Sequence, residues 1–158
     1  MDNFQGFYKE QKDKIFSYLM RMTGDYHLSM DIMQESFLRC LEKYKDKMVN
    51  NTLLYRIARN LIIDHSRKVK RKREFEQNSI DEQNSRDDFY IKQEYRQVME
   101  AMKNLENDER EILSLVLTEN LKYKEIASIM GIKENNVKVK VHRARTRLRE
   151  ILQQGDLS

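Results

Sequence analysis

Residues 121–149 have the sequence LKYKEIASIMGIKENNVKVKVHRARTRLR, and this stretch decides the fold of the second half of the chain. A short apolar segment ending at Met130 is followed by Gly131, and glycine suits a tight turn because it tolerates a positive φ angle. Projecting the longer segment after the turn at 100° per residue gives one narrow apolar stripe, made of Val137, Val141, Ala144 and Leu148. The pattern predicts two helices joined by a tight turn, as in a helix-turn-helix.

The face of the longer segment opposite this stripe is polar and cationic. Such a helix can be anchored by its apolar stripe while its exposed face enters the major groove and its cations contact phosphates. Val139 would then pack on a thymine methyl group, or it is an ordinary exposed valine; both interpretations stay open. A purely structural helical hairpin is the alternative for the motif as a whole. The predicted DNA contacts are Asn135, Asn136, Lys138, Val139, Lys140, His142, Arg143 and Arg147.

Composition favours an all-α fold. The chain has 158 residues, no proline and only four glycines, so two common helix breakers are scarce. Hydrophobic residues make up 39% and charged residues 35%, which is enough apolar surface for compact cores but not for one large core.

Charge is distributed in blocks that the formal net charge of +4 conceals. Residues 56–73 contain eight lysines and arginines against a single acid, and residues 121–150 contain nine against three acids. Residues 74–94 reverse the balance, with seven acids and two basic residues. Two basic blocks separated by an acidic one indicate two separate contacts with a polyanion.

The periodicity predicts two small helical domains joined by a flexible linker. Residues 1–73 form the first, with helices over 4–22, 28–47 and from 52 into the basic block, and Thr23-Gly24-Asp25 ends the first helix. Residues 74–86 (EFEQNSIDEQNSR) are polar and acidic, as in a linker. Residues 87–158 form the second helical domain, in which Asn107-Asp108 with Glu111 resembles a capping box.

Two further faces carry candidate functional residues. The third helix has a cationic stripe, opposite a core face formed by Leu53, Leu54, Ile57 and Leu61; the stripe consists of Arg56, Arg59, Ile63, Arg67 and Lys70, with Asn60 beside it. On the second helix, Asp31, Gln34, Glu35 and Leu38 recur at helical spacing, although Leu38 also falls on the expected apolar side with Ile32, Met33, Phe37 and Leu41. Taken alone, the second-helix stripe is typical of a solvated face.

Several motifs in register resemble bacterial sigma factors. Residues 109–112 (EREI), 123–127 (YKEIA), 131–132 (GI) and 142–145 (HRAR) look like sigma region four, while 31–37 (DIMQESF) and 54–60 (LYRIARN) are similar to region two. Their order and spacing resemble the extracytoplasmic-function (ECF) sigma factors, which keep only these two regions. Lys122 and Lys133 depart from the family, which usually has Ser or Thr helix caps there.

The resemblance implies an alternative-type sigma factor that binds core RNA polymerase and directs promoter recognition and transcription initiation. Core polymerase would bind Asp31, Gln34, Glu35 and Leu38. The cationic stripe of the third helix, with Asn60, would hold the melted minus-ten element, and the helix-turn-helix would bind the minus-thirty-five element. An anti-sigma factor is the further expected partner. The protein would be cytoplasmic, or held at the membrane by that anti-sigma partner.

Two rival functions remain at this point. A homodimeric helix-turn-helix regulator would bind an operator without core polymerase. A metal-dependent helical nuclease is the other, but His27, His65, His142 and Cys40 lack metal-ligand spacing. We therefore expect no catalytic residue, no enzyme activity, no metal or other cofactor and no small-molecule substrate. Cys40 is the only cysteine, which excludes an intrachain disulfide, and no apolar run is long enough for membrane insertion.

Overall fold

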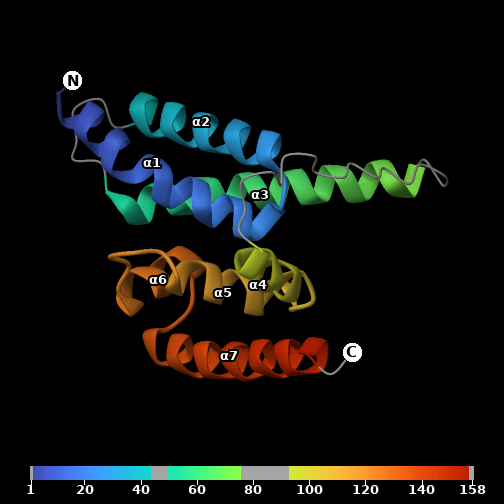
Figure 1. Ribbon diagram of the computed structural model, residues 1–158. Coiled ribbons are helices and arrows are strands. Elements are labelled where there is room, and N and C mark those ends of the chain that lie inside the picture. The colour runs from blue at the N-terminus through green and yellow to red at the C-terminus, as the bar shows by residue number, and fades with distance from the viewer. Residues whose placement is uncertain (1, 44–49, 76–92, 157–158) are drawn as a thin grey trace.

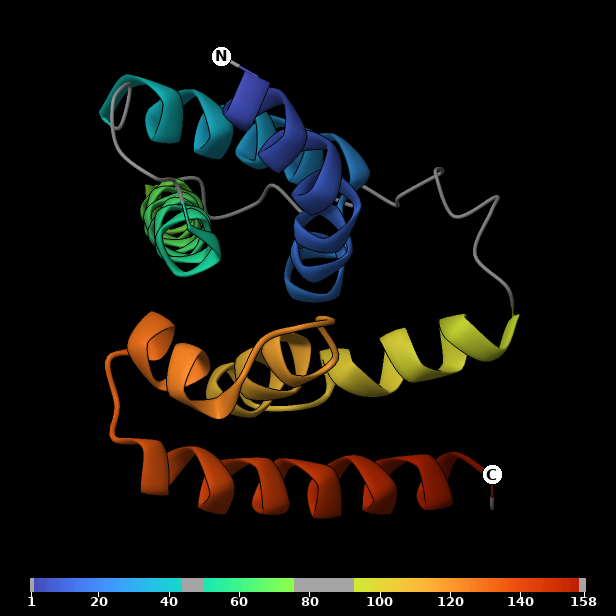
Figure 2. The ribbon, with the colours of Figure 1, turned by 90° about the vertical axis from the view of Figure 1, so that its left-hand side faces the viewer.

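The computed structural model describes residues 2–43, 50–75 and 93–156, and within these residues it contains seven helices and no strand. The predicted all-α fold is confirmed. The helices stack in two layers, with α1 to α3 in one and α4 to α7 in the other (Figures 1 and 2). In chain order they are α1 (Asp2–Thr23), α2 (Tyr26–Lys43), α3 (Asn51–Phe75), α4 (Gln93–Lys103), α5 (Asn107–Val116), α6 (Tyr123–Met130) and α7 (Glu134–Asp156).

The turn between α1 and α2 lies where the sequence predicts it. Gly24 has a φ of +65°, and its N–H donates to the carbonyl of Met20 at 2.8 Å, which closes the end of α1. The Oδ1 atom of Asp25 then accepts the N–H of Leu28 at 3.0 Å, so Asp25 caps the start of α2. A left-handed residue followed by a capping side chain thus reverses the chain.

One other predicted boundary needs correction. The described part of α2 ends at Lys43, and its predicted end near residue 47 lies outside the described residues. Helix α3 continues through Phe75, so the first two residues of the expected linker are helical, and the remainder of that linker lies outside the described residues. The described part of the second layer begins at Gln93, and its predicted start near residue 87 lies outside the described residues.

The predicted capping box of α5 is also wrong. The helix begins at Asn107, and it is Glu109 whose carboxylate accepts the N–H of Glu106 at 3.1 Å. Glu111 lies two residues further along and is buried, with 7% of its surface exposed. Its carboxylate accepts a hydrogen bond from Arg59 of α3, because this side of α5 faces the first layer.

The buried apolar side chains of the two layers form one contiguous cluster, whereas the composition predicts separate compact cores. Tyr18 and Leu54 contribute from the first layer, and Ile112 and Ile126 from the second. The layers meet where α3 packs on α6 and α1 packs on α5. Within the described ranges no helix combines the length and the apolar character needed to cross a membrane.

Candidate nucleic-acid interface

Helix α7 is held on the second layer by the apolar stripe that the sequence predicts. Val137 and Ala144 are fully buried, Val141 is 2% exposed and Leu148 is half-buried, against α5, α6 and α4. Gly131 has a φ of +70°, which an L side chain rarely adopts, and provides the turn from α6. The helix-turn-helix geometry is therefore present, with α7 in the position of the recognition helix.

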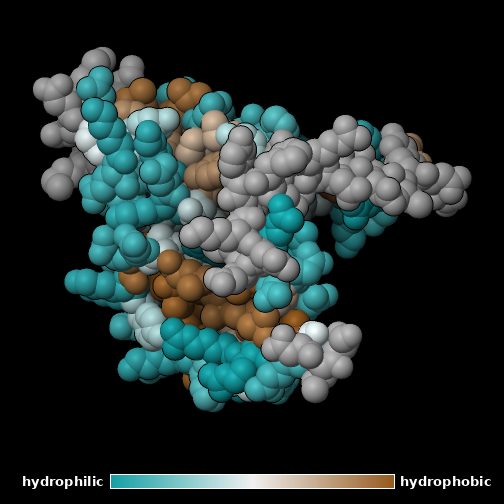
Figure 3. All heavy atoms as spheres, in the orientation of Figure 1, coloured by the Kyte–Doolittle hydropathy of each residue, from teal (hydrophilic) through white to brown (hydrophobic). Residues whose placement is uncertain are grey.

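The opposite face of α7 is open to solvent. Of the eight residues predicted to contact DNA here, seven are exposed and Lys140 is half-buried. Val139 is 48% exposed although it is aliphatic. Hydrophilic side chains cover this outer edge of the molecule, with a band of hydrophobic surface between it and the first layer (Figure 3). The polar face is therefore exposed along most of its length.

The cations at the flanks of this face have only weak protein partners. Lys140 Nζ lies 3.7 Å from Asp108 Oδ2, and Arg147 lies 3.5 Å from Glu150. Exposed ion pairs of this kind contribute at most about 1 kcal/mol each. These cations can therefore be transferred to phosphate oxygens at little cost in stability.

The cationic stripe of α3 is divided into an open part and a part paired with the second layer. Asn60, Arg67 and Lys70 are exposed and Ile63 is half-buried. The C-terminal end of α3 extends past the other helices of its layer (Figure 1). This half of the helix presents its charge freely to solvent.

Arg56 and Arg59, at the beginning of the stripe, are hydrogen-bonded to the second layer; Arg56 stays exposed and Arg59 is half-buried. Arg59 Nε donates to Glu111 Oε2 at 2.7 Å, and Arg56 donates to both the carbonyl and the hydroxyl oxygen of Ser128. Burial disfavours the charge of Arg59, but the hydrogen bond and the negative charge of Glu111 outweigh burial and raise the pKa of Arg59. Arg59 is therefore a partly buried, charge-paired residue, which the sequence does not indicate.

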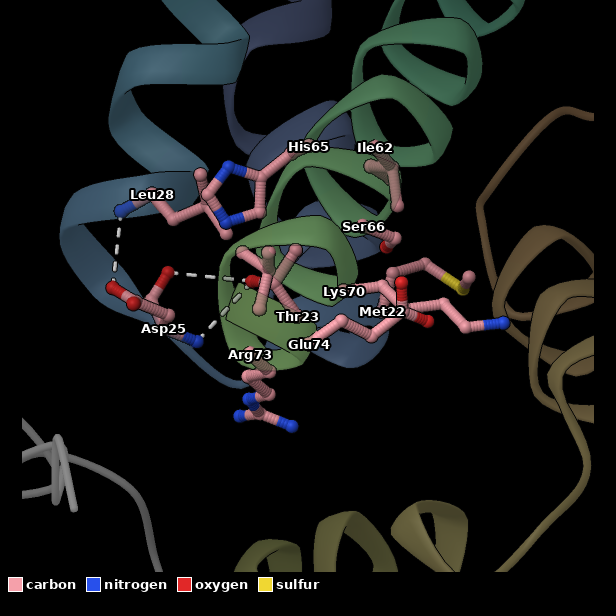
Figure 4. A pocket seen from close by; sticks show the side chains of 11 residues that line it. Met22, Thr23, Asp25, Leu28, Ile62, His65, Ser66, Lys70, Arg73 and Glu74 are labelled. Atoms are coloured by element: carbon pink, nitrogen blue, oxygen red, sulfur yellow. Dashed lines mark hydrogen bonds between the residues drawn. The ribbon is translucent and has the colours of Figure 1, made fainter. Parts of the chain in front are cut away.

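An open crevice of about 630 Å³ lies beside the exposed part of α3. Figure 4 shows that its side chains come from α3, from the end of α1, from the turn that follows and from the start of α2. In that turn, the Asp25 carboxylate accepts the N–H of Leu28, and the Asp25 N–H donates to the hydroxyl of Thr23. Lys70 of the cationic stripe is among the lining residues. The full lining is Met22, Thr23, Asp25, Leu28, Ile62, His65, Ser66, Val69, Lys70, Arg73 and Glu74.

On α2, the predicted polymerase-binding residues Asp31, Gln34, Glu35 and Leu38 are all exposed. Leu38 is 53% exposed and Leu41 is 37% exposed, so the prediction that both leucines lie on the apolar side is wrong. The buried side consists of Ile32, Met33, Phe37, Cys40 and two serines. Leu38 is thus an exposed apolar side chain on the same helix face as Asp31, Gln34 and Glu35.

Sequence reasoning missed the residues that α3 uses to contact the second layer. Tyr55 and Ala58 are fully buried although they lie outside the predicted core face; Glu111 was predicted to be a capping residue, and Ser128 was not singled out. The apolar pair at 55 and 58, three positions apart, was the available signal, because such spacing marks a second packed side of a helix. Among the described residues, no group of three or more His, Cys, Asp or Glu is arranged to hold a metal ion.

Two family models match separate parts of the chain. Sigma-70 region 2 matches residues 7–72, and sigma-70 region 4 matches residues 95–148. Among curated proteins, the ECF RNA polymerase sigma factor SigM of Bacillus subtilis is 32% identical over 154 residues, which cover 94% of each chain. SigW of the same organism, also an ECF RNA polymerase sigma factor, is 30% identical over 89% of this chain and 84% of its own.

Two solved structures share the fold. The sigma factor RpoE of Bartonella quintana, in complex with the anti-sigma factor NepR, superimposes with a TM-score of 0.79 at 21% identity, covering 97% of this chain and 98% of that one. CnrH, in complex with the cytosolic domain of CnrY, gives a TM-score of 0.71 at 17% identity, covering 96% and 88%. At these identities the likeness is one of fold.

Proposed function

We infer that this chain, which belongs to the ECF family of RNA polymerase sigma factors, contacts promoter DNA through α7 and α3 while it is attached to core polymerase. As an alternative sigma factor it directs promoter recognition and transcription initiation. The observation that carries the residue assignments is the exposed polar face of α7 opposite a fully buried apolar stripe. The match to region 2 disfavours the rival homodimeric regulator, which has no use for a polymerase-binding bundle.

We assign minus-thirty-five recognition to α7. Asn135, Lys138 and Val139 lie on the exposed face early in the helix, where recognition helices contact base edges. Arg143 and Arg147 follow on exposed turns, where they can neutralise phosphates. Because this neutralisation releases counterions, binding should weaken steeply with added salt.

We assign minus-ten binding to the cationic stripe of α3. Separating the strands costs unpairing and unstacking energy, which is offset when a cationic groove holds the single strand and a pocket receives a flipped base. Arg67 and Lys70 are exposed and available for this task, with Asn60 on the same open surface. Arg56 and Arg59 extend the same stripe, although the second layer binds both of them in the structure described here.

We assign core polymerase docking to the exposed face of α2. Asp31, Gln34 and Glu35 would face basic residues of the polymerase, and Leu38 would be buried on docking. An anti-sigma factor is the second protein partner that we propose, since the RpoE structure with this fold is a sigma factor in complex with the anti-sigma factor NepR. CnrH, which shares the fold, is likewise bound to another protein, the cytosolic domain of CnrY. We propose a cytoplasmic protein with no catalytic residue, the chemistry being that of the polymerase.

Run-off transcription tests the proposal directly. The purified chain is added to core polymerase on promoters upstream of its own and adjacent genes, and we expect transcripts that require both proteins. Asp31→Arg should reduce core binding, whereas Asp13→Arg, the same change at an exposed site on α1, should not. No transcript together with no association with core polymerase would refute the proposal, and tight operator binding by a homodimer alone would favour the rival regulator.

A further inference from the structure

The C-terminal turns of α3 carry a second group of exposed side chains, separate from the cationic stripe. Lys68, Arg71, Lys72 and Phe75 recur at i, i+3, i+4 and i+7, which places them on one face of the helix. Projection at 100° per residue puts this face roughly 100° round the helix from the stripe. We call it the terminal face of α3. It lies on the end of the helix that extends past the other helices of the first layer (Figure 1).

Phe75 is the residue of this face that solvation does not explain. Its side chain is 94% exposed, more than any other large hydrophobic side chain in the described part of the chain. A phenyl ring in water forgoes the favourable free energy of burial, so it gains from any partner that covers it. The partner that suits it best is flat, because an aromatic ring offers two flat faces for stacking.

The three cations of the terminal face are available to a partner as well. Lys68, Arg71 and Lys72 are exposed, and none of them forms an ion pair with a carboxylate of the described residues. Asp64 is exposed one turn before Lys68, and Glu74 lines the crevice on another side of the helix. The face is therefore positively charged and suits an anionic partner.

Single-stranded DNA has the chemistry that this combination recognises. Cations hold the phosphates of a single strand, while aromatic side chains stack on its unpaired bases with little dependence on sequence. A base inside a duplex is already stacked on both sides and would leave the ring uncovered. An anionic lipid surface would attract the same cations, but helices that lie in membranes bury a continuous apolar face, and here a single ring stands among three charges.

We propose that the terminal face is a second contact for single-stranded DNA, in which Phe75 stacks on an unpaired base at the edge of the melted segment and the three cations neutralise the phosphates beside it. The inference rests on the proposed binding of the melted minus-ten strand by the cationic stripe. Lys70 of the stripe and Arg71 of the terminal face are consecutive, so one strand can pass from the first surface to the second. Stacking on Phe75 would stabilise the edge of the melted segment without reading its sequence.

Fluorescence tests the stacking directly, because the chain contains no tryptophan. Phe75→Trp in the full chain places a single indole on the terminal face, and stacking on a base quenches indole emission. A 20-nucleotide oligo(dT) should quench this emission, whereas an abasic deoxyribose phosphate chain of equal length and charge should not. Tyr8→Trp is the matched control, since it places the single indole at an exposed aromatic position of α1, and neither chain should quench it.

Affinity for the same oligo(dT) separates stacking from a general apolar contact. Phe75→Leu keeps an apolar side chain without the ring and should weaken binding roughly 5- to 150-fold, the range for one stacked base, whereas Phe75→Tyr should bind like the wild type. Lys72→Ala should reduce the slope of log affinity against log salt by about 0.7, the value for one phosphate contact with a single strand. Lys9→Ala, which removes an exposed lysine from α1, should leave that slope unchanged.

Absence of quenching at position 75, or equal affinities of Phe75→Leu and Phe75→Tyr, would overturn the proposal. A blue shift of the Phe75→Trp emission with phosphatidylglycerol vesicles, without quenching by oligo(dT), would assign the terminal face to a lipid surface instead. Run-off transcription separates this inference from the proposed function. Transcripts from the wild type together with no quenching would refute the terminal face alone, whereas quenching without transcripts would refute the proposed function and leave the single-strand contact standing.

Discussion

Along α7 the polar face is open to solvent from Asn135 to Thr146, whereas the first part of the cationic stripe on α3 is hydrogen-bonded to α6 through Arg56 and to α5 through Arg59. Both helices have an apolar side and a cationic side. They differ because α7 is packed on one side only, while α3 is packed on two, with Tyr55 and Ala58 fully buried outside the predicted core face. A cationic helix face that is continuous in the sequence can therefore be partly paired with other helices of the same protein.

The largest expected effect tests the one-sided packing of α7. Val137→Asp places a charge at a fully buried position and should lower the free energy of unfolding by at least about 3 kcal/mol, since an unpaired buried charge is strongly destabilising. Val139→Asp, two residues away on the open face, should change stability by less than about 0.5 kcal/mol. Denaturant unfolding measures both, and equal losses would show that α7 is packed on both sides.

The next effect tests whether the open face of α7 binds duplex DNA. Lys138→Ala or Arg143→Ala should weaken minus-thirty-five binding roughly 5- to 150-fold, the equivalent of a contact of about 1–3 kcal/mol. Arg149→Ala removes one charge from the same helix outside the predicted contacts and should have a smaller effect. Gel shifts measure the DNA affinity, and a core-binding assay should give wild-type values for all three variants. Wild-type DNA affinity together with weakened core binding would contradict the assignment of Lys138 and Arg143 to DNA.

A smaller effect tests the part of the α3 stripe that is paired with the second layer. A double-mutant cycle of Arg59→Ala and Glu111→Ala should give a coupling energy of about 1–2 kcal/mol, because each single change leaves a partly buried charge without its partner. Arg67→Ala, on the open part of the same stripe, should alter stability by less than about 0.5 kcal/mol. A coupling energy near zero would mean that the Arg59–Glu111 pair behaves like an ordinary surface contact.

The smallest expected change in stability concerns the N-terminal caps of α2, in the first layer, and α6, in the second. Asp25 caps α2 through its side chain, whereas Lys122, at the cap position of α6, has no acceptor atom, and only the carboxylate of Glu125 approaches its N–H, at 3.4 Å. Lys122→Ser should therefore raise the free energy of unfolding by about 0.5–1 kcal/mol. Lys124→Ser, inside the first turn, should bring no gain. Thermal unfolding distinguishes the two.

Sequence reasoning succeeded where the determining contacts are local. The buried stripe of α7, the positive φ of Gly131 and the turn at Gly24 each follow from residues only a few positions apart. Nothing comparable could predict the Arg59–Glu111 pair, whose members are 52 positions apart, because it depends on how the layers pack.

The wrong predictions have the same cause, because they too depend on packing between segments that are far apart in the sequence. Glu111 resembled a capping residue in the sequence, and only the approach of α3 gives it a different partner. Leu38 and Leu41 belong to a helix whose apolar side is narrower than its apolar composition indicates, because α2 is covered on one side only. The predicted DNA and polymerase contacts themselves remain predictions.

The extension of α3 beyond its layer has a further consequence for its own stability. Arg67 and Arg71, and likewise Lys68 and Lys72, are exposed cations four residues apart, and such pairs repel one another on a helix. The favourable dipole at the end of α3 only partly compensates for this repulsion. Added salt or a bound polyanion should therefore suppress fraying of these turns, so that ordering of the helix end accompanies ligand binding and can be followed by circular dichroism.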